Sequence, residues 1–236
     1  MKSMWSSYIS KSVVFWLILF ATVSIYGQKE YGIRAGVDLS KLVRSNLQKG
    51  YQGFEIFGDL TLKDKTKIAV EIGSETFNTN ESIEQNLLYN YQVSGEYLKL
   101  GLDWEIYQRK PGEKNQITAG ARYVVASFDT AQGVTNFYDT AWVQRYGAFP
   151  NFSQKGPEHS GLSASYLEGV LGFKTHIAKQ IYLGGSFRMG FLISQKEPEN
   201  FDNLWIPGFN KVTDGARFGF SYNYGISYYL PIKKNR

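Results

Sequence analysis

Eight stretches of the chain alternate apolar and polar residues, and the connections between them are alternately short and long. A β-strand turns successive side chains to opposite faces, so each stretch predicts a strand with one oily and one wet face. Crossing a bilayer takes about 9 to 11 tilted residues, a length that the longer stretches reach. The predicted strands cover residues 33–39, 54–62, 68–75, 98–106, 117–125, 167–177, 181–193 and 217–230.

The order of the connections is the second constraint. Transmembrane barrels have an even number of strands, short periplasmic turns and long external loops. The sequence therefore predicts an all-β fold, an eight-stranded antiparallel up-and-down transmembrane β-barrel with both termini in the periplasm. The connections that give this pattern lie at 40–51, 63–66, 78–90, 108–116, 129–164, 178–180 and 195–214.

The first 27 residues predict a signal peptide. Lys2 and Lys11 precede the apolar run 13–23, and small or polar residues follow at 24–27, which is the order of a secretory signal. The run is shorter than the roughly 20 residues of a spanning helix, so a membrane anchor is the less favoured alternative. We expect cleavage before Gln28, with residues 28–236 forming the barrel domain.

Alternation alone does not decide which face points inward. A soluble, lipocalin-like barrel shows the same pattern turned inside out. Strand length, loop asymmetry and the glycines on the polar face favour lipid outside, because eight strands leave an interior just wide enough for side chains. Charges there must pair, since an unpaired ion away from water costs several kcal/mol. We expect a salt-bridged lumen that blocks conduction, built from Arg34, Asp38, Glu55, Asp59, Glu71, Glu75, Lys99, Asp103, Glu105, Arg122, Glu168, Lys174, His176, Arg188 and Arg217.

Composition limits the partners and the kinds of site that the chain can have. The net charge of +5 is spread over single basic residues, so no nucleic-acid partner is expected. There is no cysteine, which excludes disulfides and thiolate metal sites. Aromatic residues near strand ends predict an interfacial girdle, with ordinary rim packing as the alternative; these are Tyr89, Tyr91, Trp104, Tyr107, Phe128, Tyr166, Phe218, Tyr228 and Tyr229.

On these patterns, residues 31–231 resemble the small eight-stranded outer-membrane proteins of Gram-negative bacteria. The aromatic alternation of 218–230 is similar to the assembly signal in the terminal strand of that family, although residues 231–236 follow where a final aromatic would stand. The resemblance implies the outer membrane of a Gram-negative bacterium and contact with its lipid.

The chain shows little sign of catalysis. His159 and Ser160 are adjacent, whereas nucleophilic catalysis needs a base and a hydroxyl that face each other. Glu71 and Glu75 resemble paired acids, but lumen salt bridges account for them better. The sequence has no nucleophile elbow, His-x-x-x-His pair or phosphate-binding glycine loop. We expect no catalytic, cofactor-binding or metal-binding residues.

The long connections are more informative. Large aromatics left in water mark contact surfaces, so we expect a protein partner there, with a folded-back cap as the alternative; the residues are Phe137, Tyr138, Trp142, Tyr146, Phe149, Phe152, Phe201, Trp205 and Phe209. Asp129-Thr130-Ala131 and Asp139-Thr140-Ala141 resemble acceptors for O-glycosylation in some Gram-negative bacteria. Ile83, Leu87 and Leu88 suggest a helical turn with an oily side.

These observations predict a non-catalytic structural or interaction subunit of a larger outer-membrane complex, with barrel-assembly or secretion machinery as the favoured host. The expected partners are outer-membrane lipid and outer-membrane proteins, without a small-molecule substrate. Two alternatives stay open. One is a lipid-modifying enzyme, which His159→Ala or Ser160→Ala would test, and the other is a monomeric adhesin or envelope-stabilising barrel.

Overall fold

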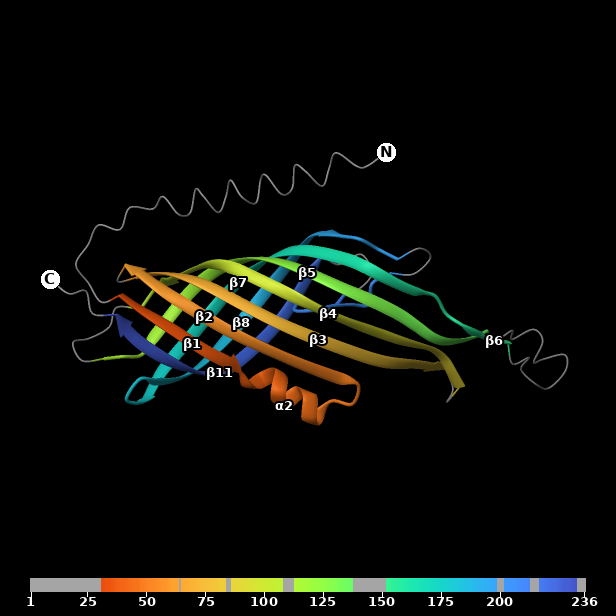
Figure 1. Ribbon diagram of the computed structural model, residues 1–236, viewed down its shortest axis with the longest axis horizontal. Coiled ribbons are helices and arrows are strands. Elements are labelled where there is room, and N and C mark those ends of the chain that lie inside the picture. Colours follow the sequence, from red (N-terminus) through yellow and green to blue (C-terminus); the bar gives the residue numbers. More distant parts are fainter. Residues whose placement is uncertain are drawn as a thin grey trace.

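The computed structural model describes residues 31–63, 65–83, 86–107, 113–137, 152–198, 202–212 and 217–232. Eight antiparallel strands close into a barrel in chain order, and the last pairs with the first (Figure 1). The predicted fold class is therefore confirmed. The strands are β1 (Tyr31–Asp38), β2 (Tyr51–Lys63), β3 (Thr66–Ile83), β4 (Asn86–Glu105), β5 (Gln116–Phe137), β7 (Glu158–Ala178), β8 (Ile181–Gln195) and β11 (Phe218–Ile232).

The pairing register fixes the tilt of the strands. A path of directly paired residues that starts at Phe218 returns to β11 at Tyr228, ten residues further along; it runs through Phe191, Leu167, Tyr123, Leu100, Val70, Gly58 and Ala35. With the usual spacings between residues and strands, this stagger over eight strands gives a tilt of about 40°. Each residue then rises about 2.5 Å along the barrel axis.

The two ends of the barrel differ. At the turn end, β1 begins, β11 ends, and the short β2–β3 and β7–β8 turns lie (Figure 1). Lys179 in the second of these turns has a positive φ of 50°. The opposite end, here called the loop end, carries the long connections. The predicted signal peptide, residues 1–27, lies outside the described residues.

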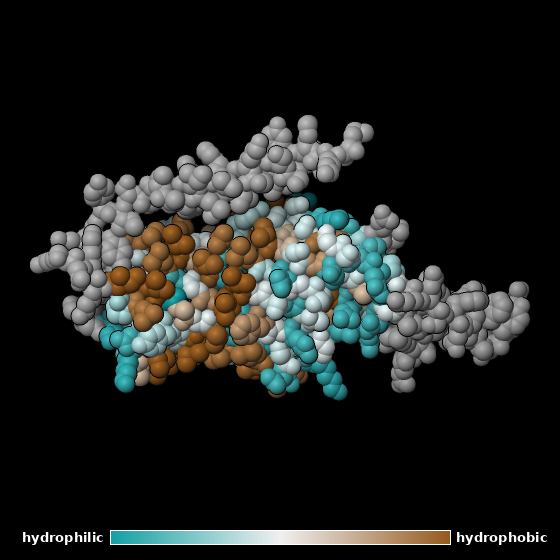
Figure 2. All heavy atoms as spheres, viewed as in Figure 1, coloured by the Kyte–Doolittle hydropathy of each residue, from teal (hydrophilic) through white to brown (hydrophobic). Residues whose placement is uncertain are grey.

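An apolar belt lies on the half of the barrel nearer the turn end. Figure 2 shows it on the viewed face, and each of the eight barrel strands contributes exposed large apolar side chains. On β8 the outward side chains are 37 to 54% exposed, and all are large and apolar: Ile181, Leu183, Phe187, Met189, Phe191 and Ile193. Single exposed apolar residues are common on soluble proteins, but a continuous band is the mark of a lipid-facing barrel. The oily strand faces point outward, as strand length, loop asymmetry and the glycines of the polar face indicated.

Four strands continue beyond this belt. β3, β4, β5 and β7 have 18, 20, 22 and 21 residues, whereas β1 has 8. In their outer parts the pattern inverts, since Ser74, Glu96 and Ser127 face outward and are exposed while Phe128 and Tyr166 face inward and are buried. This projecting wall follows the rule for strands in water, and Figure 2 shows it largely polar.

These long strands correct several expectations. The segments 78–90 and 129–164 were expected to be loops, but strands occupy much of both, so a helical turn at Ile83 and Leu87 is wrong. Tyr91, Phe128 and Tyr166 are buried inside the barrel and do not belong to an interfacial girdle. Each lies an even number of residues from a lumen charge on its own strand, and this spacing places it on the inward face.

One helix, α2 (Leu39–Leu47), follows β1 directly. The side chain of Asp38 caps it by accepting hydrogen bonds from the backbone N–H groups of Ser40 and Lys41. This cap ends the strand, so Leu39 begins a helix where a strand residue was expected. α2 packs against β2 and β11. Among the described residues, no helix is long and apolar enough to span a membrane.

The last long connection folds back into the barrel. Strands β9 (Trp205–Ile206) and β10 (Asn210–Lys211) form a small hairpin whose turn has positive φ at Gly208 and Asn210. Trp205, Ile206 and Phe209 are at most 4% exposed, because they complete an apolar core inside the barrel, at the level of the projecting wall. The wall residues of this core include Tyr51, Tyr91, Val93, Tyr97, Val124, Phe128, Leu162, Tyr166 and Leu192.

Candidate functional site

The lumen is the most elaborate part of the molecule, and three clusters of polar side chains fill it. The first lies at the turn end, where Arg34 and Lys174 reach the same oxygen of Asp59, at 3.2 and 2.6 Å. The Arg34 guanidinium also stacks on the ring of Tyr182, 4.7 Å from its centroid. Gln116 accepts hydrogen bonds from Arg34 and from Lys67, and the ammonium of Lys67 lies 3.9 Å from Glu105.

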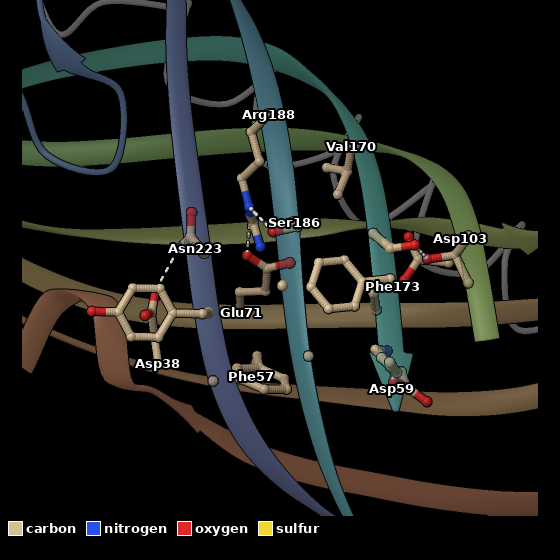
Figure 3. Close-up of a pocket in the computed structure, with 18 of the residues that line it drawn as sticks. Asp38, Phe57, Asp59, Glu71, Asp103, Val170, Phe173, Ser186, Arg188 and Asn223 are labelled. Atoms are coloured by element: carbon tan, nitrogen blue, oxygen red, sulfur yellow. Dashed lines mark hydrogen bonds and ion pairs between the residues drawn. The ribbon is translucent and has the colours of Figure 1, made fainter. Parts of the chain in front are cut away.

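The second cluster crosses the middle of the barrel. Glu71 accepts from Arg122 at 3.0 Å and from Arg188 at 2.5 Å, so one carboxylate joins β3 to β5 and β8 (Figure 3). Glu168 accepts from Lys99 at 2.7 Å and from Arg188 at 3.2 Å. A further bond of 2.8 Å links Arg122 to Asp103. Three carboxylates and three cations balance one another, which is how buried charges are retained.

The third cluster lies at the boundary between the charged lumen and the apolar core, and Glu75 is its centre. The carboxylate accepts from the Tyr51 hydroxyl at 3.1 Å, the Trp205 indole N–H at 3.2 Å and the Gly208 N–H at 3.1 Å. The ammonium of Lys41 donates to it as a fourth partner. One side chain of β3 therefore holds α2, β2 and the β9–β10 hairpin together.

We call this junction of α2, β2 and the β9–β10 hairpin the closure. A second carboxylate, Glu55, stabilises it. Glu55 lies 3.9 Å from the Lys41 ammonium and accepts a hydrogen bond of 2.5 Å from Tyr97. Beyond it the lumen becomes apolar, and burial raises the pKa of the Tyr91 hydroxyl to about 12. The phenol thus stays neutral inside the projecting wall.

Between the clusters lies a cavity of about 70 Å³. Asp38, Phe57, Asp59, Glu71 and Asn223 are among its lining residues (Figure 3). Pockets for organic ligands usually have about 300 to 1,000 Å³, so this cavity has room for water and not for a substrate. The described residues include no cluster of three or more His, Cys, Asp or Glu side chains that could hold a metal ion.

Three of the expected lumen residues behave differently from the rest. Asp38 is buried but caps α2 and accepts from Asn223, without an ion pair in the described part of the chain. His176 bonds the Lys179 carbonyl at 2.6 Å in its own turn, and its ring meets Tyr182 edge-on with centroids 5.3 Å apart. Arg217, expected inside, is exposed because it precedes the first residue of β11.

Several cluster members were missed from the sequence. Lys67 lies four residues before Glu71, and Tyr97 lies two residues before Lys99, so period two places both on the lumen face. Lys41 and Trp205 carry no such signal, since they come from a helix and a short hairpin.

The expected partner-contact aromatics divide into two groups. For Trp205 and Phe209 the expectation is wrong, because Trp205 stacks on Phe77 with ring centroids 4.2 Å apart and Phe209 meets Tyr166 edge-on at 5.0 Å. The cap alternative describes them. Tyr138, Trp142, Tyr146, Phe149 and Phe201, with the side chains of Phe137 and Phe152, lie outside the described residues.

The structure also bears on the glycosylation acceptors and on the His159–Ser160 pair. Thr130 is only 5% exposed and faces the lumen, so it is not an accessible glycosylation acceptor, and Thr140 lies outside the described residues. His159 and Ser160 are consecutive residues of β7, half-buried and exposed respectively. Consecutive strand residues point to opposite faces, so this imidazole is not arranged to take the proton of this hydroxyl.

A closed barrel with an apolar belt, a lumen filled with paired charges and a projecting polar wall defines an integral β-barrel of the Gram-negative outer membrane. The chain belongs to the family described as "Domain of unknown function (DUF6048)", which matches residues 5–235. No curated protein matches the chain.

Three solved structures that resemble the chain are distant from it in sequence. The attachment invasion locus protein Ail of Yersinia pestis is 9% identical, with a TM-score of 0.42, over 86% of this chain and 100% of that one. A major outer membrane protein from Thermus thermophilus is 10% identical, with a TM-score of 0.47, over 85% and 99%. CarO2 of Acinetobacter baumannii is 13% identical, with a TM-score of 0.40, over 87% and 100%.

Proposed function

We propose that the protein is a non-conducting, non-catalytic barrel that serves as an interaction subunit of a larger outer-membrane assembly, with barrel-assembly or secretion machinery as the favoured host. The observation that carries this proposal is the projection of β3, β4, β5 and β7 beyond the belt, over a lumen filled by ion pairs and by the β9–β10 hairpin. Such a barrel has exposed surfaces that a protein partner can bind, but no open pore through which a solute could pass. With both termini in the periplasm, the projecting wall stands outside the cell.

The free edge of β3 is the proposed contact surface. β2 begins at Tyr51, opposite Phe77, and the Asn78 N–H still bonds the Gly50 carbonyl at 2.7 Å. Beyond it, residues 79–83 pair with β4 on one side, and no strand of the described chain pairs with the other. An exposed strand edge is a template for an added strand from a partner.

Side-chain hydrogen bonds link this edge to the neighbouring strand. The Asn90 amide of β4 donates to Asn78 at 2.8 Å and to Asn80 at 2.6 Å, and these bonds tie the two strands together above the core. Bonds that restrain an edge before a partner docks reduce the conformational entropy lost on binding, so more of the binding energy is retained.

Affinity purification in mild detergent tests the proposal. In the test variant, Asn-Gly replaces residues 81–89, which shortens the β3–β4 hairpin. In the matched control, Asn-Gly replaces Lys179-Gln180 at the turn end. We expect the wild type and the control to retain an outer-membrane protein that the shortened variant loses. Wild-type protein that elutes alone would overturn the subunit role, and a partner kept by the shortened hairpin would overturn the contact surface.

Planar-bilayer recording tests the filled lumen separately. We expect no conductance steps from the purified barrel under conditions in which a porin conducts, because the ion pairs and the hairpin close the pore. Regular open-channel steps would contradict a non-conducting role.

A further inference from the structure

The wall of the barrel has a seam on one side. β1 ends at Asp38, which pairs with Gly225 of β11, and its last pair with β2 joins Val37 to Ile56. β2 and β11 both continue toward the loop end without it. In the described chain, residues 51–55 of β2 and 218–224 of β11 therefore have no strand on the side that faces β1.

The seam opens beside the apolar belt. Phe218, Phe220 and Tyr222 of β11 are 57, 60 and 75% exposed and point outward at this level. An open sheet edge does not occur in the hydrocarbon of a membrane, because its N–H and C=O groups would find no partner. The seam must therefore be covered.

α2 covers the seam and packs against both of its edges. The Ser45 hydroxyl oxygen accepts from the Gly53 N–H of β2 at 2.9 Å and lies 3.4 Å from the Gly53 carbonyl. On the other edge, the side-chain amide of Asn223 in β11 donates to Asp38, the last residue of β1 and the cap of the helix. A helix thus replaces the missing part of β1.

The faces of α2 are inverted relative to a helix of a soluble protein. Lys41 is 8% exposed and Arg44 is half-buried, and both point toward the lumen side. Leu42, Val43 and Leu47 lie on the opposite face and are 38, 41 and 80% exposed. A surface helix in water buries its apolar stripe, whereas α2 presents this stripe to the outside, as the strands of the belt do.

We propose that α2 is a membrane-embedded part of the barrel wall and that its Leu42, Val43 and Leu47 face binds lipid acyl chains, in the leaflet nearer the loop end. The argument rests on the continuity of this face with the lipid-facing belt of β11 and on the inverted polarity of the helix. The inference concerns lipid and is independent of any protein partner.

Single-cysteine labelling tests it cleanly, because the chain has no cysteine. Val43→Cys and Leu47→Cys are labelled with a small fluorophore and reconstituted into phosphatidylcholine vesicles, with or without brominated acyl chains. Leu183→Cys in the belt is the lipid control and Ser94→Cys on the projecting wall is the water control. Heat-modified migration on gels shows that each variant is folded.

We expect brominated lipid to reduce the fluorescence at positions 43 and 47 by a fraction close to that at 183, with weak quenching by iodide. The Ser94→Cys label should respond in the opposite way. Strong iodide quenching at 43 and 47 without lipid quenching would overturn the proposal. Protection from both quenchers would also overturn it, since it would show that protein, such as a second copy, covers the face.

Discussion

Replacement of Glu75 by glutamine should loosen the closure at the loop end without opening the barrel wall. The substitution keeps the size of the side chain and removes the charge on which Lys41, Tyr51, Trp205 and the Gly208 N–H converge. Among the carboxylates that the structure describes, Glu55, at 3.9 Å, would remain as the ion-pair partner of Lys41. Removal of one partner of a buried ion pair costs about 3 to 5 kcal/mol.

This cost falls on the docking of the β9–β10 hairpin and α2, because the substitution removes no bond of the strand ladder. At 1.4 kcal/mol for each factor of ten, it lowers the docking equilibrium constant by roughly 10² to 10³·⁵. Amide hydrogen exchange over residues 202–212 measures this directly, since exchange there requires undocking. The matched control is Glu96→Gln, which changes an exposed carboxylate on the outer face of β4.

Exchange in 202–212 that stays equal in Glu75→Gln and Glu96→Gln would refute the role of Glu75 as the centre of the closure. The double variant Lys41→Met, Glu75→Gln sharpens the test. It leaves no unpaired ammonium, so protection should partly return. Additive losses would show that the two residues act independently.

Three further predictions concern packing and the belt. Gly190→Ala should destabilise the folded barrel by about 1 to 3 kcal/mol in urea titrations, because a Cβ would lie 2.8 Å from the Phe209 ring; stability equal to wild type would show that the ring moves freely. Phe187→Lys should cost about 2 to 4 kcal/mol, because Phe187 lies midway between Ile181 and Ile193, the ends of the belt on β8. Ser94→Lys on the projecting wall should cost almost nothing, and equal costs would contradict the placement of the belt. Glu71→Gln should lower unfolding stability by about 3 to 5 kcal/mol, since two arginines lose their shared carboxylate, and an unchanged urea midpoint would contradict this.

The strand number and the two faces of each strand could be predicted because period-two alternation is a local signal, and the outward direction of the oily faces followed from strand length, loop asymmetry and the glycines of the polar face. Strand ends could not be predicted by the same rule. On β5 the outward residues are Tyr123 and Val125, then Ser127 and Asp129, while the inward residues change from Arg122 to apolar ones. The alternation continues, but beyond Val125 the apolar residues lie on the inward face and the polar residues on the outward face. A search for one continuous apolar face therefore ends the strand at Val125.

The closure was harder to predict because its members are far apart in sequence. Glu75 and Trp205 are separated by 130 positions, and their bond depends on where a connection folds. Exposed loops and buried plugs both use large aromatics, so composition could not distinguish Trp205 as a partner contact from Trp205 as a plug. Only the position of the hairpin inside the wall decides it.

The height of the belt supports the proposal that the outward faces of the strands and of α2 contact the same lipid. On β5 the apolar outward residues run from Ile117 to Val125, which at about 2.5 Å for each residue is a height of about 20 Å. On β8 they run from Ile181 to Ile193, and on β11 from Leu230 to Phe218, which is about 30 Å on each strand. The two values bracket the roughly 25 Å band of transmembrane barrels. Because the belt on β11, one edge of the seam, continues to Phe218, the outer face of α2 lies beside lipid-facing side chains, where lipid, and not water, decides which side chains face outward.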